Sequence, residues 1–269
     1  MPEYRGLSPE VDGQANLGSP TQKWGKVHAN RVLTAGSLYR RRTRKAFTLA
    51  DLAAAVADGD YAARDIDVGD YFTGASGYTY IFAGDNPLKG TNSYTITANH
   101  AGLIVDTHAA TLWNDTADTT GGYVASKLHS YLTDTVLPNV KSDLGETHLI
   151  AHYKLYSNSI NATGYNRYGT NTGCSNNFAW SASQYISALT EMQIYGGTVW
   201  SSSGHDTGEA DQQLEVFKRF KHTDIFGDEF PWLRDVVSAT KVCVADAYGS
   251  ARNYVTTNGS IAVGLICFH

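Results

Sequence analysis

VADAYGSARNYVTTNGSIAVGLICFH, residues Val244–His269, combines two apolar runs with a polar segment between them. SIAVGLICFH (260–269) is strand-like, and so is ATKVCVADAYG (239–249), which overlaps the start of the quoted stretch. The segment between the runs is rich in Tyr, Ser, Arg and Asn and has few aliphatic residues. Apolar, β-branched runs bounded by Gly and Asn predict strands. We therefore expect two buried strands that carry a polar, aromatic turn.

Residues 66–269 mix strand-like and helical patterns, which predicts the α+β fold class. Strands are predicted at DYFTG (70–74), YTYIFAG (78–84), YTITANHAGLIVD (94–106) and HLIAHYKL (148–155), and helices at YVASKLHSYLTDTVL (123–137), ISALTEMQIYGG (186–197) and GEADQQLEVFKRF (208–220). The first helix should bury Val124, Leu128, Tyr131 and Val136 and break or kink at Pro138. In the third helix, Leu214 and Phe217 should point inward.

Composition narrows the class of protein. A chain of 269 residues with 42% hydrophobic and 17% charged residues is typical of one large folded domain, or one domain with an appendage. The net charge of −5 argues against general binding to nucleic acid or anionic membranes. No apolar run reaches the roughly 20 residues of a membrane span. Cys243 and Cys267 lie in apolar runs, which predicts buried free thiols.

The first 65 residues differ from the rest. Residues 1–45 contain short β-like pieces but too few apolar side chains to build a core, so we expect a β-rich segment that depends on partners. Five of the six residues 40–45 are basic; they form either a solvated face or a contact with an acidic protein. Residues 46–65 are predicted as a short helix and linker, capped by Thr48 and ended by Gly59. This helix should pack on a neighbouring chain or on the following domain.

The sequence does not show a catalytic constellation. The phosphate-binding, dinucleotide-binding, serine-hydrolase and zinc-protease motifs are missing from it. His205, Asp206 and Glu209 form the richest polar cluster, but their spacing matches no strong metal-ligand pattern, and Glu209 fits the start of a helix. We therefore expect a protein that is not an enzyme and has no cofactor or bound metal.

DGQANLGSPTQKWGKVHANRV (Asp12–Val32) resembles a segment that recurs in phage tail-fibre and related virion proteins. The shared pattern is D-G-x-x-N-L-G-S-x-x-x-x-W-x-x-V-x-A. In those proteins the segment is a small β unit within a homotrimeric fibre. The resemblance therefore implies that residues 1–45 serve trimerisation and attachment to other virion proteins.

A second resemblance covers most of residues 67–269. GGYVASKLHSYL, MQIYGGTVWSSSGHDTGEADQQLEVFK, FPWLRDVVSATKVCVADAYG and the closing GSIAVGLICF resemble a C-type-lectin-like domain common in gut bacteria and their phages. That domain is similar to the fold shared by sulfatase-modifying proteins and phage receptor-binding proteins. AVGLICF (262–268) departs from the usual V-R-P-x-F ending, and the Cys pair of the sulfatase-modifying enzymes is not recognisable. The resemblance implies the fold for residues 66–269, without that enzymatic activity.

In such domains a terminal strand closes the fold and the residues before it form the binding face. The matching positions here are Asp246, Tyr248, Ser250, Arg252, Asn253 and Tyr254, with Trp232 and Arg234 upstream. Tyr, Ser, Asn and Arg suit an adaptable binding surface. A plain polar turn between strands is the alternative. A second candidate loop contains Tyr165, Asn166, Arg167 and Tyr168, and its alternative is a packed structural insertion.

These resemblances imply a phage virion protein: a homotrimeric fibre whose lectin-like tip binds a glycan or protein on the host surface. Such a chain would be assembled in the host cytoplasm, located in the virion, and neither bind nucleic acid nor insert into membranes. The alternative is a capsid-decorating or baseplate protein without a receptor of its own. An enzyme acting on cell-wall glycans is a weaker alternative, because no acid and base pair stands out.

Overall fold

The computed structural model describes residues 44–89, 96–152, 155–157, 178–180, 184–200 and 213–269. The chain divides into two units, residues 1–43 and Arg44–His269, and the described residues all belong to the second. The fibre-like segment is outside the described residues, apart from Arg44 and Lys45. The second candidate loop (165–168) and the cluster at His205, Asp206 and Glu209 are also outside them.

A four-stranded antiparallel sheet forms the centre of the domain, in the order β1 (Tyr71–Thr73), β2 (Thr79–Asp85), β3 (Ala101–Leu112) and β9 (Gly259–Phe268). The longest pairing joins β3 to β9, from Ala101 opposite Phe268 to Leu112 opposite Gly259. Every residue of β9 after Gly259 is buried. The predicted closing strand is therefore confirmed, and it is a central part of the core.

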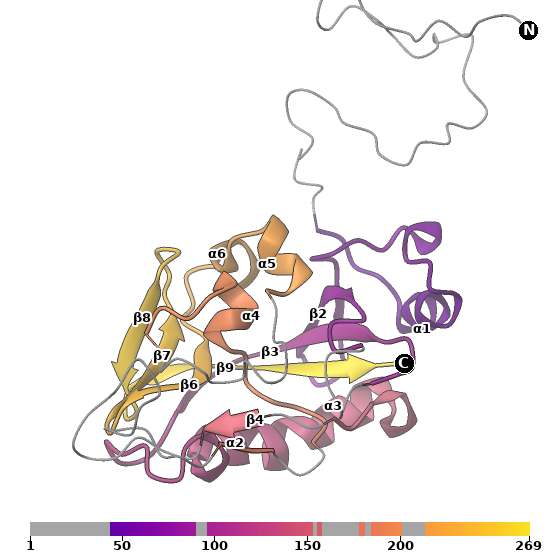
Figure 1. Ribbon diagram of the computed structural model, residues 1–269. Coiled ribbons are helices and arrows are strands. Elements are labelled where there is room, and N and C mark those ends of the chain that lie inside the picture. Colours follow the sequence, from indigo (N-terminus) through magenta and orange to yellow (C-terminus); the bar gives the residue numbers. More distant parts are fainter. Residues whose placement is uncertain (1–43, 90–95, 153–154, 158–177, 181–183, 201–212) are drawn as a thin grey trace, which may run out of the picture. The chain divides into compact units, whose positions relative to one another are not determined.

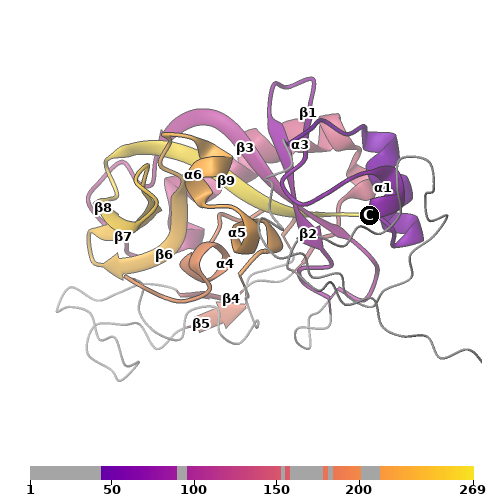
Figure 2. The same ribbon diagram turned by 90° about the horizontal axis from the view of Figure 1, so that it is seen from above.

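The second edge of β9 is covered by single β-bridges. Leu149, Ser187 and Pro231 each pair with it, at Phe268, Leu265 and Ile261 respectively. In both views the carboxyl end of β9 lies beside α1 (Figures 1 and 2). The strand can be apolar throughout because each of its sides is in contact with other parts of the domain.

A three-stranded antiparallel sheet, β6 (Trp232–Ser238), β7 (Lys241–Ala245) and β8 (Ala251–Val255), lies at the end of the domain opposite α1 (Figures 1 and 2). The predicted strand at 239–249 is confirmed over β7, whereas β6 and β8 go beyond that prediction. A short pair, β4 (Leu155–Ser157) and β5 (Phe178–Trp180), forms a third sheet. Helices and antiparallel sheets together make the domain α+β, as predicted.

The first helix, α1 (Leu49–Asp58), has the predicted ends. Thr48 accepts a hydrogen bond from the Asp51 amide, and Gly59 ends the helix with φ of 67°. Leu52, Ala55 and Val56 are buried in the same core as the sheet. The helix therefore packs on the domain that follows it. A single 3₁₀ turn, η1 (Ala62–Arg64), leads from it to β1.

A long helical segment runs below β9 in Figure 1: η2 (Tyr123–Ala125), α2 (Lys127–Ser130), the π-helical η3 (Tyr131–Val136) and α3 (Leu137–Leu144). It buries a row of aliphatic residues four apart: Leu128, Leu132, Val136, Val140 and Leu144. Pro138 lies in the first turn of α3 and does not end the helical path. Proline lacks an N–H, and its ring crowds the backbone of the preceding turn. The π turn, which is wider than an α turn, occupies that preceding turn and makes room for the ring.

Other expectations need correction. Leu128 and Val136 are buried as predicted, but Val124, in the 3₁₀ turn η2, is 37% exposed and Tyr131 is half-buried. HLIAHYKL is not one strand: it begins in the turn η4 (Glu146–His148), forms two isolated bridges and reaches β4 only at Leu155. The apolar residues in this stretch suggest a continuous strand. In the structure, Leu149 instead makes a single bridge to Phe268 of β9.

The remaining helices are short and lie on the other side of β9 from α2 and α3 in Figure 1: α4 (Glu191–Tyr195), α5 (Glu215–Arg219) and α6 (His222–Phe226). Leu214 and Phe217 are buried, as predicted. Trp113 and Trp232 are the largest fully buried side chains of the core. Within the described residues, every helix is too short or too polar to cross a bilayer.

Candidate functional site

Two of the predicted binding residues belong to the core. Trp232 has no exposed surface, and its Nε1 donates to the Thr111 carbonyl oxygen at 2.9 Å. Arg234 follows on the same strand and is 4% exposed. Side chains this deeply enclosed cannot meet a receptor at the surface, so the prediction for these two residues is corrected. The W-L-R-D sequence begins β6 and holds the two sheets together.

Asp246 is a structural residue of the turn between β7 and β8. It is 1% exposed, and its carboxylate accepts hydrogen bonds from the Tyr248 amide at 2.9 Å and from the Ser250 amide and hydroxyl at 2.9 and 2.7 Å. Burial by itself would raise its pKa, but these hydrogen bonds and the nearby Arg252 lower it overall. Asp246 therefore shapes the turn from inside as an anion.

Arg252, Asn253 and Tyr254 lie on the strand β8 and not on a loop. Successive side chains of a strand point to opposite faces, so Asn253 faces away from the other two. Tyr254 is half-buried; its ring stacks on Phe230 with centroids 5.9 Å apart. The predicted window is therefore divided, and only Tyr248, Ser250 and Arg252 are exposed together.

Tyr248 is the most exposed large side chain of this window, at 83%. The guanidinium carbon of Arg252 lies 5.9 Å from its ring centroid, and the Arg252 Nε is 3.2 Å from the Asp246 carboxylate. The carboxylate thus holds the arginine beside the tyrosine ring, a cation–π arrangement. The buried Asp246 therefore orients the exposed Arg252 and Tyr248.

Trp200 extends this surface and was not predicted as a site residue. It is 42% exposed, and its indole Nε1 donates to the Ala251 carbonyl oxygen at 3.0 Å. Its backbone amide donates to the buried Glu191 carboxylate. The sequence signal is a lone Trp in a Gly- and Ser-rich stretch, GGTVWSSSG. We call Trp200, Tyr248, Ser250 and Arg252 the Tyr248 surface.

The Tyr248 surface rests on ordered neighbours. The Tyr195 hydroxyl donates to the Ser250 carbonyl oxygen at 3.0 Å, and the His222 Nε2 lies 2.6 Å from the Asp246 carbonyl oxygen. Burial is the main reason that the pKa of His222 is lowered and that of Tyr195 is raised. Both groups are therefore neutral near pH 7, and they act as fixed hydrogen-bond partners of the turn.

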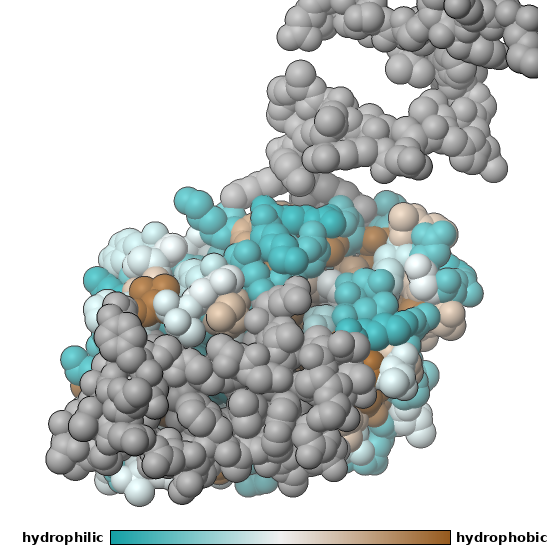
Figure 3. Space-filling view, viewed as in Figure 1, coloured by the Kyte–Doolittle hydropathy of each residue, from teal (hydrophilic) through white to brown (hydrophobic). Residues whose placement is uncertain are grey.

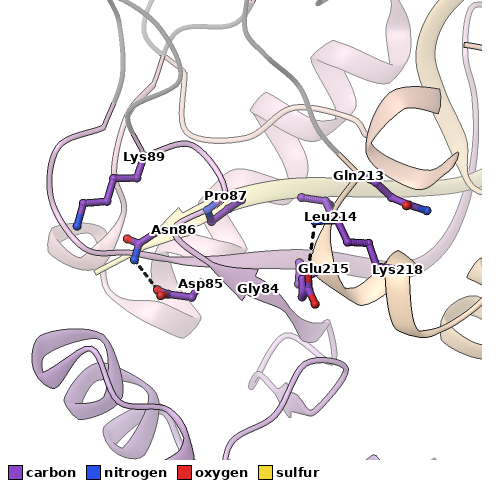
Figure 4. Close-up of a pocket in the computed structure, with 10 residues that line it drawn as sticks. Gly84, Asp85, Asn86, Pro87, Lys89, Gln213, Leu214, Glu215 and Lys218 are labelled. Carbon is purple, nitrogen blue, oxygen red and sulfur yellow. Dashed lines mark hydrogen bonds and ion pairs between the residues drawn. The ribbon is translucent and has the colours of Figure 1, made fainter. Parts of the chain in front are cut away.

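A cavity of about 210 Å³ lies elsewhere, between the turn after β2 and the start of α5. Figure 4 shows Asp85, Asn86 and Lys89 on one side and Glu215 and Lys218 on the other. The Asn86 amide donates to Asp85 at 2.7 Å, and Lys218 pairs with Glu215 at 3.3 Å. Two carboxylates and two lysines offset each other's charge, so this cavity does not select an ionic ligand.

The described surface seen in Figure 3 is mostly hydrophilic, with small hydrophobic areas. Its hydropathy scale rates Tyr and Trp as mildly hydrophilic, so an aromatic surface does not stand out there. Large, rigid aromatic rings beside an arginine favour binding to another surface, since they contribute contact area at a low cost in side-chain entropy. The Tyr248 surface is therefore the candidate site, and its side chains are of the types that suit contact with another surface.

Comparisons of the chain with models of known protein families, with curated proteins and with solved structures found no match.

Proposed function

We propose that the chain is a phage virion protein, a homotrimeric fibre whose tip binds a receptor on a bacterial surface through the Tyr248 surface. The observation that carries the proposal is the 83% exposure of Tyr248 on a turn whose backbone is held by a buried carboxylate. Rigid placement of an exposed aromatic side chain reduces the entropy lost on binding. The fibre-like pattern at Asp12–Val32 supports the virion assignment.

The C-type-lectin-like fold is part of this proposal. Its supports are a terminal strand that closes the sheet and a carboxyl end beside α1 (Figures 1 and 2). The residues that precede this closing strand include the exposed Tyr248, and in the domains that the sequence resembles the residues before the closing strand form the binding face. The α+β class is common to many other folds, so a structure determined with the bound receptor is the direct test of this assignment.

Trimerisation would strengthen a weak single site. Three copies of the Tyr248 surface on one fibre would engage a repetitive bacterial surface together, and the second and third contacts would form at a high effective concentration. The proposal therefore expects strong binding to whole cells or polymeric envelope glycans and weak binding to short, monovalent fragments of the same glycan.

The test uses the full chain. Light scattering measures its mass against three times 29.2 kDa, and fluorescently labelled protein is incubated with a panel of gut bacteria and their envelope polysaccharides. We expect a trimer that binds some strains and loses at least tenfold in binding as the Tyr248→Ala variant. Val124→Ala removes another exposed hydrophobic side chain and should bind like the unmodified chain.

Two results would overturn the proposal. A monomer that binds neither cells nor polysaccharide would remove the fibre and the receptor together. A trimer that coats phage shells uniformly under a labelled antibody, and does not bind bacteria, would favour capsid decoration instead.

A further inference from the structure

Strand β3 departs from its regular pairing with β9 at one place. Asp106 pairs with Val263, but the next pair is Ala110 with Ile261, so residues 107–109 bulge out of the ladder. The Thr107 hydroxyl donates to the Ala262 carbonyl oxygen at 2.9 Å and ties the base of the bulge to β9. Bulges of this kind redirect side chains and occur often beside functional sites.

His108 lies at the tip of the bulge in a left-handed conformation, with φ of 52°. That conformation is unfavourable for a residue other than glycine. Its amide donates to Asp106 Oδ1 at 2.9 Å, and its Nδ1 is 3.4 Å from the same oxygen. Its Nε2 lies 2.9 Å from the Thr79 hydroxyl on the neighbouring strand β2, which fixes the ring. The bulge therefore presents the imidazole Nδ1 beside a carboxylate.

A second carboxylate arrives from a distant part of the chain. Glu229 lies between α6 and β6, in a loop held to β9 by a hydrogen bond of 3.1 Å from the Ile261 amide to the Phe230 carbonyl oxygen. Ligand atoms of Asp106, His108 and Glu229 all lie within 4.8 Å of one another. Asp106 is buried, Glu229 half-buried and His108 exposed, so the group is enclosed at its base and open toward solvent.

Local cations compensate these two carboxylates only in part. Arg44 is near enough to act electrostatically on Asp106, but its guanidinium donates to the Gly69 carbonyl oxygen at 2.6 Å and reaches the carbonyls of Asp224 and Ile225. Two carboxylates brought together around a half-enclosed space repel each other. A cation bound between them would relieve that repulsion.

We propose that Asp106, His108 and Glu229 bind a divalent transition-metal ion of the zinc or manganese type. One imidazole and two carboxylates are ligands that such ions accept, and three protein ligands leave a position for water. Bonds of about 2.1 Å in a tetrahedral site put ligand atoms about 3.4 Å apart, close to the 3.4 Å between His108 Nδ1 and Asp106 Oδ1. Thr79 takes the place of the outer partner that orients a metal-bound histidine.

The upper bound of 4.8 Å on the ligand spacing exceeds the roughly 3.4 Å of a tetrahedral site. Glu229 has a long side chain with several rotatable bonds, so its carboxylate can move closer to the other two ligands. The site is built on β3 and the 227–231 loop, whereas the Tyr248 surface is built on the 196–200 segment, the turn between β7 and β8, and β8 itself. The two proposals are therefore independent, and each is tested by variants that leave the other site unchanged.

The experiment titrates the full chain, freed of metal by a chelator, with zinc chloride and then manganese chloride in a calorimeter. We expect one tight site per chain and at least a tenfold loss of affinity in Glu229→Gln and in His108→Asn. Asparagine tolerates the left-handed conformation, so His108→Asn removes the imidazole while keeping the bulge. Circular dichroism spectra of both variants should match that of the unmodified chain.

The control is the double variant His148→Gln with His269→Gln, which removes two other histidines whose rings lie 6.4 Å apart near the carboxyl end. Its affinity should equal that of the unmodified chain. The proposal is overturned if neither zinc nor manganese binds to the chain. It is also overturned by binding that Glu229→Gln and His108→Asn leave intact, or by binding that the control variant abolishes. In each of those cases the contact between Asp106 and His108 serves only to hold the bulge.

Discussion

The backbone amide of Trp200 donates to the buried carboxylate of Glu191, with N–O distances of 3.1 and 3.0 Å to the two oxygens. The amide of Val199 donates to the same carboxylate at 2.9 Å. Glu191 has no exposed surface and occupies the first position of α4, where a negative charge is favoured by the helix dipole. The buried Glu191 carboxylate thus fixes the backbone that carries the exposed Trp200 indole.

Replacing Glu191 with Ala should destabilise the domain strongly. Two backbone amides would lose their acceptor, and each buried, unsatisfied group costs about 1–3 kcal/mol. We expect the free energy of unfolding, measured by urea titration, to fall by about 2–4 kcal/mol. Glu146→Ala is the control, since it removes a surface ion pair with Lys141 and should cost less than about 1 kcal/mol. Equal losses in both variants would contradict the structural role of Glu191.

Tyr248 and Tyr254 should respond in opposite ways to substitution by Ala. Tyr248 is 83% exposed, so its loss should change stability by less than about 0.5 kcal/mol and reduce receptor binding. Tyr254 packs on Phe230 and Trp232, so its loss should cost about 1–3 kcal/mol. Thermal melts and cell binding of the two variants check this. A stability loss in Tyr248→Ala as large as that in Tyr254→Ala would show that the turn is packed, not exposed.

Stability should decrease as the pH falls from 7.5 to 5.5. His100 is buried; its Nε2 accepts the Leu88 amide at 3.2 Å and its Nδ1 lies 3.0 Å from the Ala98 carbonyl oxygen, an arrangement that fits the neutral ring. Burial is the main cause of its lowered pKa; the Ala98 carbonyl and Asp85 favour the charged ring, and Lys89 and His269 oppose it. The pKa values of His129 and His222 are also lowered, mainly by burial.

The folded protein loses stability in acid because proton binding is linked to unfolding. Below about pH 6.5 the unfolded chain binds protons that the folded histidines do not, so acid favours unfolding by up to about 1.4 kcal/mol per pH unit for each group. Urea titrations at both pH values measure the effect. His100→Gln should show a smaller loss between them than the unmodified chain, whereas the half-buried control His148→Gln should show the same loss as the unmodified chain. Equal stability at both pH values would contradict the prediction.

Cys243 and Cys267 should be unreactive in the folded protein. Both are free thiols without exposed surface, and burial is the main cause that raises the pKa of Cys243 well above its usual value. The third cysteine, Cys174, is outside the described residues, so the test uses Cys174→Ser. We expect a thiol reagent to label neither cysteine before urea is added and both afterwards. Rapid labelling of the folded variant would show that one of these strands opens.

Several elements could be predicted because their signals are local. Thr48 and Gly59 bound α1 as expected, since capping depends on residues within one turn of the helix end. β7 and β9 were predicted from apolar runs that need burial in any fold. In the helical segment before Pro138, Leu128 and Val136 point inward as predicted, whereas Val124, in the 3₁₀ turn η2, and Tyr131, at the start of the π turn, do not.

The candidate site was predicted less well. Trp232 and Arg234 have the residue types of a binding surface, yet they are enclosed between two sheets. Trp200 was missed because its exposure depends on Glu191 and Ala251, to which it is bound from different parts of the chain. Residue type indicates what a side chain can bind, while its exposure depends on which distant segments pack over it.

The amino-acid sequence by itself determined the α+β class, the closing strand Gly259–Phe268 and the ends of α1, because apolar periodicity and capping act between neighbouring residues. Only the tertiary structure decided that Asp246 supports the turn from inside while Tyr248 faces solvent, and that Glu229 lies beside Asp106 and His108. Burial and long-range contact arise from the packing of whole strands and loops, which pairs residues far apart in the chain.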